Sequence, residues 1–252
     1  MALTKVGKDG IIGVSNSADA NALFIDSSER VGVGATPNAT FGSHLYAQGT
    51  PAVNKPIISA YSQGNSNKAG IGILNDAGNR GIWTDSNDLL FTTSYEGNST
   101  VHMKIDTNGI ITKPLQPAFL AQPSSQQSNI PINATTTIVF GTERFDLNAD
   151  FASNTFTAPV TGKYQLNVQL YLLNVDIDTG HLQLNLTTSN RSYINIMALR
   201  FSEDLDYFSP NISVLADMDA NDTAIVTITL SNNGAAQMDV NASSSFSGYL
   251  VC

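Results

Sequence analysis

The sequence contains little of what redox, nucleic-acid-binding and membrane-binding proteins depend on. Its one cysteine, Cys252, stands at the last position, so no disulfide can form within the chain. Lys and Arg together number 12 against 21 Asp and Glu, and the formal net charge is −9. An acidic chain repels phosphate backbones and anionic lipid headgroups, so we expect it to bind no nucleic acid and no membrane surface.

Long hydrophobic runs and a secretory leader are missing as well. No apolar run approaches the roughly 20 residues of a membrane span, so membrane insertion is not expected. The opening residues, MALTKVGKDG, lack the apolar core of a secretory signal. We therefore expect the protein to leave its cell by another export route, or by assembly and lysis.

Charge of either sign is scarce, and uncharged polar residues take its place. Only 13% of residues are charged, about half the usual share, whereas 42% are hydrophobic. The chain has 25 Asn, 25 Ser and 23 Thr, which supply the polar surface. Exposed helices prefer Glu, Lys and Ala, so this composition predicts an all-β protein with many turns.

Signatures of catalysis are also absent. The three histidines, His44, His102 and His181, lie far apart and have no zinc-ligand spacing. No Gly-x-Ser-x-Gly elbow occurs, and neither of two glycine pairs that begin like a phosphate loop has its third glycine. We predict that the chain is not an enzyme, although a glycosidase carboxylate pair has no fixed spacing and stays an alternative.

The first half of the chain repeats a short phrase. KDGIIG, SERVGVG and TNGIIT each place a turn-forming polar pair before a short β-branched run. Such strands are too short to bury a core alone, so they need partners from neighbouring repeats or neighbouring chains. We predict a β-rich stalk over residues 35–113, either intertwined between chains or a small β domain. The prolines of PLQP mark a neck at 114–117.

Beyond the neck, hydrophobic and polar residues alternate strictly. Period two with one polar face predicts antiparallel sheets, and the recurrence of such strands predicts a sandwich or barrel. The residues expected to share inward faces are Tyr164, Leu166, Val168 and Leu170, then Leu182, Leu184 and Leu186, and then Val226, Ile228 and Leu230.

Three phrases in this half resemble the globular heads of the first complement component, relatives of tumour necrosis factor. They are FTAPVTGKYQLNVQLYL at 156–172, DTAIVTITLSNNG at 222–234 and SSFSGYLV at 244–251. The Gly-Asp usual before the penultimate strand is replaced by Asn221–Asp222. The resemblance implies a ten-strand jelly-roll head over residues 118–252 that assembles as a homotrimer.

In that family an apolar flank of each subunit packs against the next. We predict that the flank contains the aromatic residues Tyr164, Tyr171, Phe246 and Tyr249. The alternative for each residue is the internal core of a single chain, and the sequence alone does not separate the two.

Two phrases in the first half, ALFIDSSERVGVGATP at 22–37 and MKIDTNGIITKPLQPAF at 103–119, resemble tail-fibre and other virion-appendage proteins of bacteriophages, notably of marine and cyanobacterial phages. The resemblance implies a virion protein, extracellular after release, whose residues 1–34 attach it to other virion proteins. Its trimeric knob would bind a host-surface glycan or protein. A capsid or tail decoration protein and a secreted carbohydrate-binding protein are the alternatives.

Strand order predicts which loops of the head lie together. If both ends of the domain meet at the neck, loops 174–181, 201–208 and 231–244 lie at the far end, and loops near 189–191 and 217–222 lie at the neck end. The far-end loops are acidic, and Glu203 and Asp239 belong to them. We predict a calcium or receptor-contact site there, formed by Asp176, Asp178, Asp204 and Asp206. A merely solvated tip is the alternative.

Overall fold

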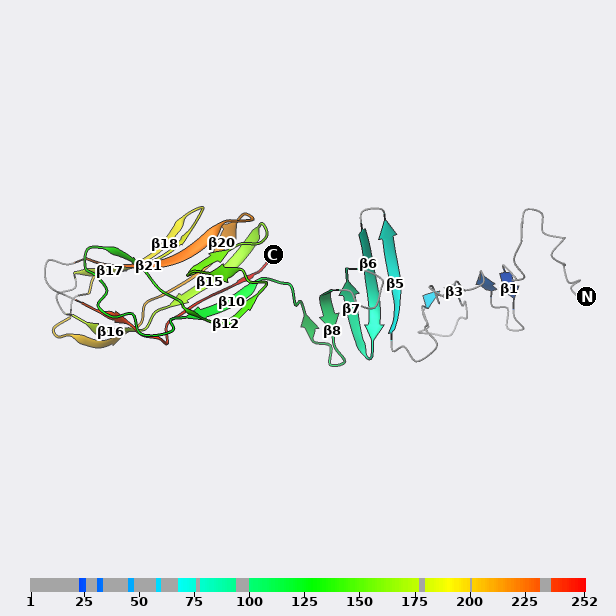
Figure 1. The fold of residues 1–252 in the computed structure, drawn as a ribbon, viewed down its shortest axis with the longest axis horizontal. Coiled ribbons are helices and arrows are strands. Elements are labelled where there is room, and N and C mark those ends of the chain that lie inside the picture. The colour runs from blue at the N-terminus through cyan, green and yellow to red at the C-terminus, as the bar shows by residue number, and fades with distance from the viewer. Residues whose placement is uncertain are drawn as a thin grey trace, which may run out of the picture. The chain divides into compact units, whose positions relative to one another are not determined.

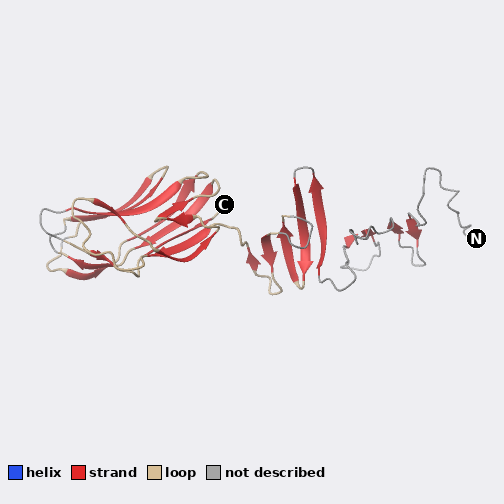
Figure 2. Ribbon diagram, viewed as in Figure 1, coloured by secondary structure: helices blue, strands red, loops and turns tan. Residues whose placement is uncertain are grey.

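The computed structural model describes residues 23–25, 31–33, 45–47, 58–59, 68–75, 78–93, 100–176, 180–199, 201–231 and 237–252. Within these ranges the chain consists of strands, turns and loops without a helix (Figure 2). The all-β prediction is therefore confirmed. The chain divides into two compact units, Met1–Lys113 and Pro114–Cys252. The predicted boundary between an attachment segment and a stalk at residue 34 lies outside the described residues.

The first unit contains two antiparallel sheets whose strands follow one another in chain order. The four-stranded sheet is formed by β1 (Leu23–Ile25), β2 (Val31–Val33), β3 (Leu45–Ala47) and β4 (Ile58–Ser59). The five-stranded sheet is formed by β5 (Lys68–Asn75), β6 (Gly78–Asp85), β7 (Asp88–Thr92), β8 (Val101–Ile105) and β9 (Ile111–Thr112).

The turn between β8 and β9 shows how the TNGIIT phrase reverses the chain. Asp106 accepts hydrogen bonds on Oδ1 from the backbone N–H of Asn108 at 2.8 Å and of Ile110 at 2.9 Å. These bonds, with that from Ile110 the strongest influence, hold the pKa of Asp106 below its ordinary value. Gly109 has φ +80°, a conformation that glycine adopts without strain. The carboxylate and the glycine together form the turn that reverses the chain.

The second unit is a jelly-roll sandwich of a five-stranded and a six-stranded sheet (Figure 1). The first sheet has the order β12 (Thr142–Leu147), β10 (Ala118–Gln122), β23 (Ser245–Leu250), β15 (Gly162–Gln169), β20 (Asn211–Met218). The second has the order β13 (Phe151–Ala152), β14 (Thr155–Thr157), β21 (Thr223–Ser231), β17 (His181–Thr188), β18 (Ser192–Met197), with β11 (Thr135–Thr137) also paired to β21. The sandwich itself is confirmed, but the two sheets contain eleven described strands and a third, small sheet adds three, so the predicted ten are divided into more and shorter strands.

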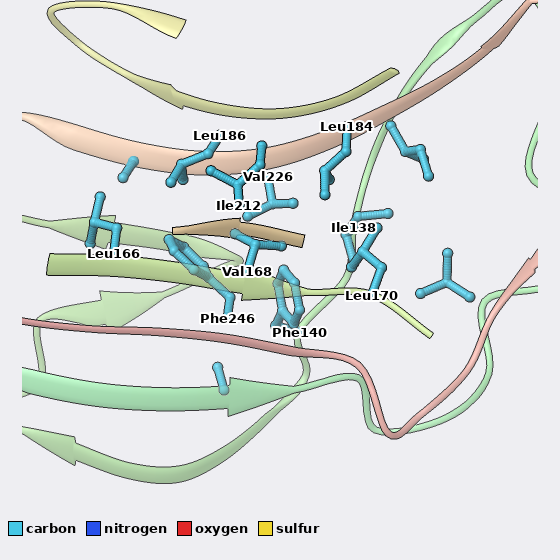
Figure 3. Packing of buried hydrophobic residues seen from close by; sticks show 14 of the residues in the cluster. Ile138, Phe140, Leu166, Val168, Leu170, Leu184, Leu186, Ile212, Val226 and Phe246 are labelled. Atoms are coloured by element: carbon cyan, nitrogen blue, oxygen red, sulfur yellow. The ribbon is translucent and has the colours of Figure 1, made fainter. Parts of the chain in front are cut away.

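The core lies between the two sheets, where the predicted alternation holds. Figure 3 shows Leu184, Leu186 and Val226 of the second sheet directed towards Val168 and Phe246 of the first. The ring of Phe119 occupies the centre of an aromatic cluster. Its centroid lies 4.7 Å from Phe156, 5.0 Å from Phe151 and 4.9 Å from Phe246. Every residue of the three predicted inward sets is buried.

Both ends of the second unit meet, as the strand order predicts. The N–H of Leu250 donates to the carbonyl of Pro117 at 3.0 Å, and the N–H of Lys163 donates to the carbonyl of Cys252 at 2.7 Å. At the opposite end a small three-stranded sheet joins β19 (Leu205–Phe208), β16 (Leu172–Val175) and β22 (Asp239–Val240). Figure 1 shows β16 far from the C-terminus. The predicted far-end loops are thus partly strands.

Two glycines of the family-like phrases lie where no side chain fits. A Cβ on Gly248 would stand 2.6 Å from Leu166 Cδ2 and 2.9 Å from Phe119 Cε1. A Cβ on Gly162 would stand 2.6 Å from the carbonyl oxygen of Cys252. Gly248 therefore makes room for the aromatic cluster, and Gly162 lets the C-terminal residue approach β15.

Gly248→Ala is expected to destabilise the second unit by about 1–3 kcal/mol, because the added methyl group overpacks the core. In thermal unfolding of the full chain, this corresponds to a fall of about 2–4 °C in Tm for each kcal/mol. Ser243→Ala, an exposed change in the same segment, serves as the control and is expected to leave Tm unchanged. An unchanged Tm for Gly248→Ala would contradict the packing described above.

Candidate functional site

The outward side of the sheet β12-β10-β23-β15-β20 carries exposed apolar side chains. Ala118 pairs with both Leu147 and Tyr249, and Gln165 pairs with both Tyr249 and Leu215, so these five residues form one row across the sheet. The neighbouring row consists of Phe145, Leu120, Ser247, Asn167 and Ser213. We call the two rows together the open face.

Four large apolar side chains of the open face are exposed to solvent. Phe145, Leu147, Leu215 and Tyr249 expose between 39% and 58% of their surface. Neither row contains a charged residue. A contiguous exposed apolar patch of this kind is typical of an interface between proteins.

The polar part of the open face satisfies its own hydrogen bonds. Gln165 Nε2 donates to Asn167 Oδ1 at 3.1 Å and to Ser213 Oγ at 3.0 Å, and Ser213 Oγ donates to Asn167 Oδ1 at 2.8 Å. Burying polar groups is costly only where their hydrogen bonds are lost, and burying charges is costlier still. The open face can therefore be covered at a low desolvation cost.

The four predicted interface aromatics do not lie together. Tyr164 and Phe246 have no exposed surface and belong to the core of the single chain, so their prediction as subunit contacts is wrong. Burial raises the pKa of Tyr164, whose hydroxyl donates a 2.7 Å hydrogen bond to the carbonyl of Val160. Tyr171 packs against Tyr207 at 5.8 Å near the far end. Tyr249 alone stands on the open face.

The predicted acidic site is only partly described. Asp176 Oδ2 accepts a 2.8 Å hydrogen bond from the N–H of Gln237, which ties two far-end segments together. Asp204 and Asp206 are exposed, and Asp178 lies outside the described residues. Across the described ranges, no three His, Cys, Asp or Glu side chains are grouped so as to hold a metal ion. Calcium binding stays a prediction.

Asp239 has a structural role that its sequence context does not reveal. It is nearly buried and accepts hydrogen bonds from Gln126 Nε2 at 2.8 Å, from the N–H of Asn129 at 2.8 Å and from Asn174 Nδ2 at 3.0 Å. These donors come from segments more than sixty residues away in the chain. The carboxylate thus links the small far-end sheet to the loop that contains Gln126 and Asn129.

The neck-end loops are joined by surface polar contacts. Arg191 Nη2 lies 2.8 Å from Asp217 Oδ2, and both side chains are well exposed. Asn190 Nδ2 donates to the carbonyl of Asp217 and to Asp222 Oδ2, each at 3.0 Å. Exposed pairs of this kind contribute about 0–1 kcal/mol, so we read these contacts as loop positioning.

The carboxylate of Asp150 lies in an environment that disfavours its charged form. Asp150 Oδ2 is buried and has no hydrogen-bond partner, whereas both oxygens of neighbouring Asp146 accept backbone N–H groups, from Asp150 at 3.1 Å and from Phe151 at 3.0 Å. Burial raises the pKa of Asp150, and repulsion from Asp146 raises it further.

The raised pKa makes stability depend on pH. Between the ordinary and the raised pKa of Asp150 the folded state binds more protons than the unfolded state, so the free energy of unfolding falls as pH rises through this window and stays lower above it. Asp150→Asn removes the charge and is expected to raise stability at pH 7 by about 1 kcal/mol, or about 3 °C in Tm. The gain should shrink below about pH 4, where Asp is protonated in both states.

Thermal unfolding of the full chain at pH 4 and pH 7 measures this effect. Asp146→Asn is the matched control and should destabilise, because it weakens two charge-assisted bonds to the backbone. A gain for Asp150→Asn that is equal at both pH values would contradict the assignment.

The fold and the open face together define a jelly-roll β-sandwich domain with a surface suited to association. The family model described as the C1q domain matches residues 118–251, which is more than half of the chain, and the chain therefore belongs to the C1q-domain family. Domains of the C1q and tumour necrosis factor type typically form trimers, bind ligands or receptors, and are generally not enzymes.

Solved structures that match the chain do so at low sequence identity. The globular domain of the zebrafish complement 1qA protein has 17% identity and a TM-score of 0.42, with 54% of this chain and 98% of that chain covered. Murine APRIL at pH 8.0 has 15% identity and a TM-score of 0.40, with coverages of 54% and 98%. No curated protein matches the chain. The described residues include no helix suited to crossing a membrane.

Proposed function

We propose that the protein is a structural virion component, a homotrimeric fibre whose knob binds a host cell-surface glycan or protein and which catalyses no reaction. The open face is the observation that carries the trimer, because it is an uncharged apolar surface on a domain of a family that typically forms trimers. The virion assignment is supported by the phage-appendage phrases of the first unit and by their union with a C1q domain in one chain.

A second apolar patch supplies the complement that the open face needs. Ile194 and Ile196 on β18 expose 56% and 59% of their surface at the edge of the other sheet. Asn195 Nδ2 donates to the carbonyl of Asn211 at 2.8 Å, so the edges β18 and β20 run together along one side of the sandwich. Contact between two different patches forms a closed ring when the rotation between subunits is 120°.

The far end of the sandwich is the proposed receptor-contact region. Both ends of the second unit, near Pro117 and Leu250, lie at the neck end. The far end therefore carries no connection to the first unit. Tyr207 exposes 65% of its surface there, close to the exposed Asp206. Three equivalent weak sites on one trimer act together through their effective concentration, so firm attachment does not require a strong single site.

The trimer is tested by the mass of the full chain in light scattering at micromolar concentration. We expect three times the chain mass for the unmodified protein. Tyr249→Asp places a charge on the open face and should weaken association by about 10²–10³-fold, the effect of losing a central aromatic contact. Val139→Asp, an equally exposed apolar residue outside the open face, should leave the mass threefold. A monomeric unmodified chain would defeat the proposal, and a Tyr249→Asp trimer that dissociates on dilution no more readily than the unmodified trimer would exclude the open face from the interface.

The virion role is tested by electron microscopy of particles labelled with antibody to this chain. Labelling at fibres, together with binding of the purified full chain to host cells, is the expected result. Labelling without cell binding would identify a decoration protein instead. Unlabelled particles would leave the secreted carbohydrate-binding alternative and would overturn the virion assignment. Deletion of residues 1–34 should abolish incorporation if this segment attaches the protein.

A further inference from the structure

The sheet β5–β9 of the first unit has two unlike sides. Pairing registers place Ile71, Ile82, Phe91 and Met103 in one row across four strands. Leu89, Ile105 and Ile111 form a second row with Thr84, two residues along the strands from the first row and therefore on the same side. We call the seven apolar residues of the two rows the apolar face. Neither row contains a charged residue.

On the opposite side of this sheet, side chains of the sheet itself contact one another. Lys104 Nζ lies 2.5 Å from Asp88 Oδ2, an ion pair suited to a solvated surface. The indole of Trp83 lies directly over Gly70, where a Cβ would stand 2.5 Å from Trp83 Cε3. Leu90 shares this side, because it pairs with both Trp83 and Lys104. The side with Lys104 and Trp83 is therefore suited to contact with water, whereas the apolar face is not.

No second layer covers the apolar face within the described part of the chain. Ile71 and Ile111 expose 53% and 57% of their surface, and the other five side chains are only half-buried. The buried hydrophobic residues of the described ranges all belong to the second unit, from Phe119 to Phe246. A sheet with one apolar side needs another layer against it to be stable in water.

We propose that the apolar face is covered by the same face of other copies of this chain, so that the first unit is itself part of the trimer. This inference rests on the proposed trimeric function. Only residues 113–117 separate β9 from β10, so three associated C1q domains tether three copies of the sheet at high effective concentration. Threefold closure turns all three faces inward and leaves none for further association.

The chemistry of the face favours copies of itself over another partner. Its seven residues are aliphatic, aromatic or thioether groups without charge, so like faces meet without electrostatic repulsion. A partner with a charged surface would lose hydration against this face and gain no ion pair. The strands of the apolar face thereby acquire a layer that the described residues of one chain do not provide.

Cross-linking of the full chain in a Cys252→Ser background tests the arrangement. Phe91→Cys lies on the apolar face, and its neighbour Leu90→Cys lies on the opposite side of the same strand. With a short bismaleimide, Phe91→Cys is expected to give covalent dimers and trimers at least tenfold faster than Leu90→Cys. Met103→Cys against Lys104→Cys repeats the comparison on β8, so the test does not depend on one variant folding.

The outcomes separate this inference from the proposed function. A threefold mass with preferential cross-linking at residues 91 or 103 supports both. A threefold mass with equal or no cross-linking at the two members of each pair overturns the inference and leaves the trimeric knob intact. A monomeric mass overturns the proposed function, and the inference with it.

Discussion

An apolar side of a β-sheet must be shielded from water by another layer, and this requirement governs the molecule. In the second unit two sheets shield each other, and a continuous core extends from the Phe119 cluster to Leu184 and Val226. Among the described residues of its own unit, the open face on the outward side of one sheet has no such layer. The apolar face of β5–β9 likewise has none among the described residues of the first unit. These two faces are therefore the surfaces that the proposed trimer would cover.

The scarcity of charge has a physical counterpart in these uncovered surfaces. On the open face the polar positions are Gln165, Asn167 and Ser213, which bond to one another and can be buried with their bonds intact. Lysine or glutamate at these positions would carry a desolvation cost that an interface must overcome. A sequence with few charges and with 25 Asn and 25 Ser therefore suits the covered open face that the proposed trimer requires.

Local alternation was enough to predict the sandwich, because the parity of a strand assigns its inward side. Tyr164 shares parity with Leu166 and Val168, so the alternation alone places it in the core and contradicts its prediction as a subunit contact. Leu215 carries the opposite parity to Ile212, Val214 and Ala216, and this is the signal that identifies it on the open face. Phe145 and Leu147 also alternate, but their side depends on the bulge opposite Leu120, which only the pairing reveals.

Long-range polar contacts were beyond the reach of the sequence. Asp239 looks like any acidic loop residue, yet three donors from distant segments make it a fixed part of the far-end sheet. Asp176 is similarly engaged by Gln237. Both carboxylates link segments at this end of the sandwich. Under the proposed function, the exposed side chains of Tyr207 and Asp206 are available for recognition there. Repetition in the proposed trimer would multiply a contact that is weak in one subunit.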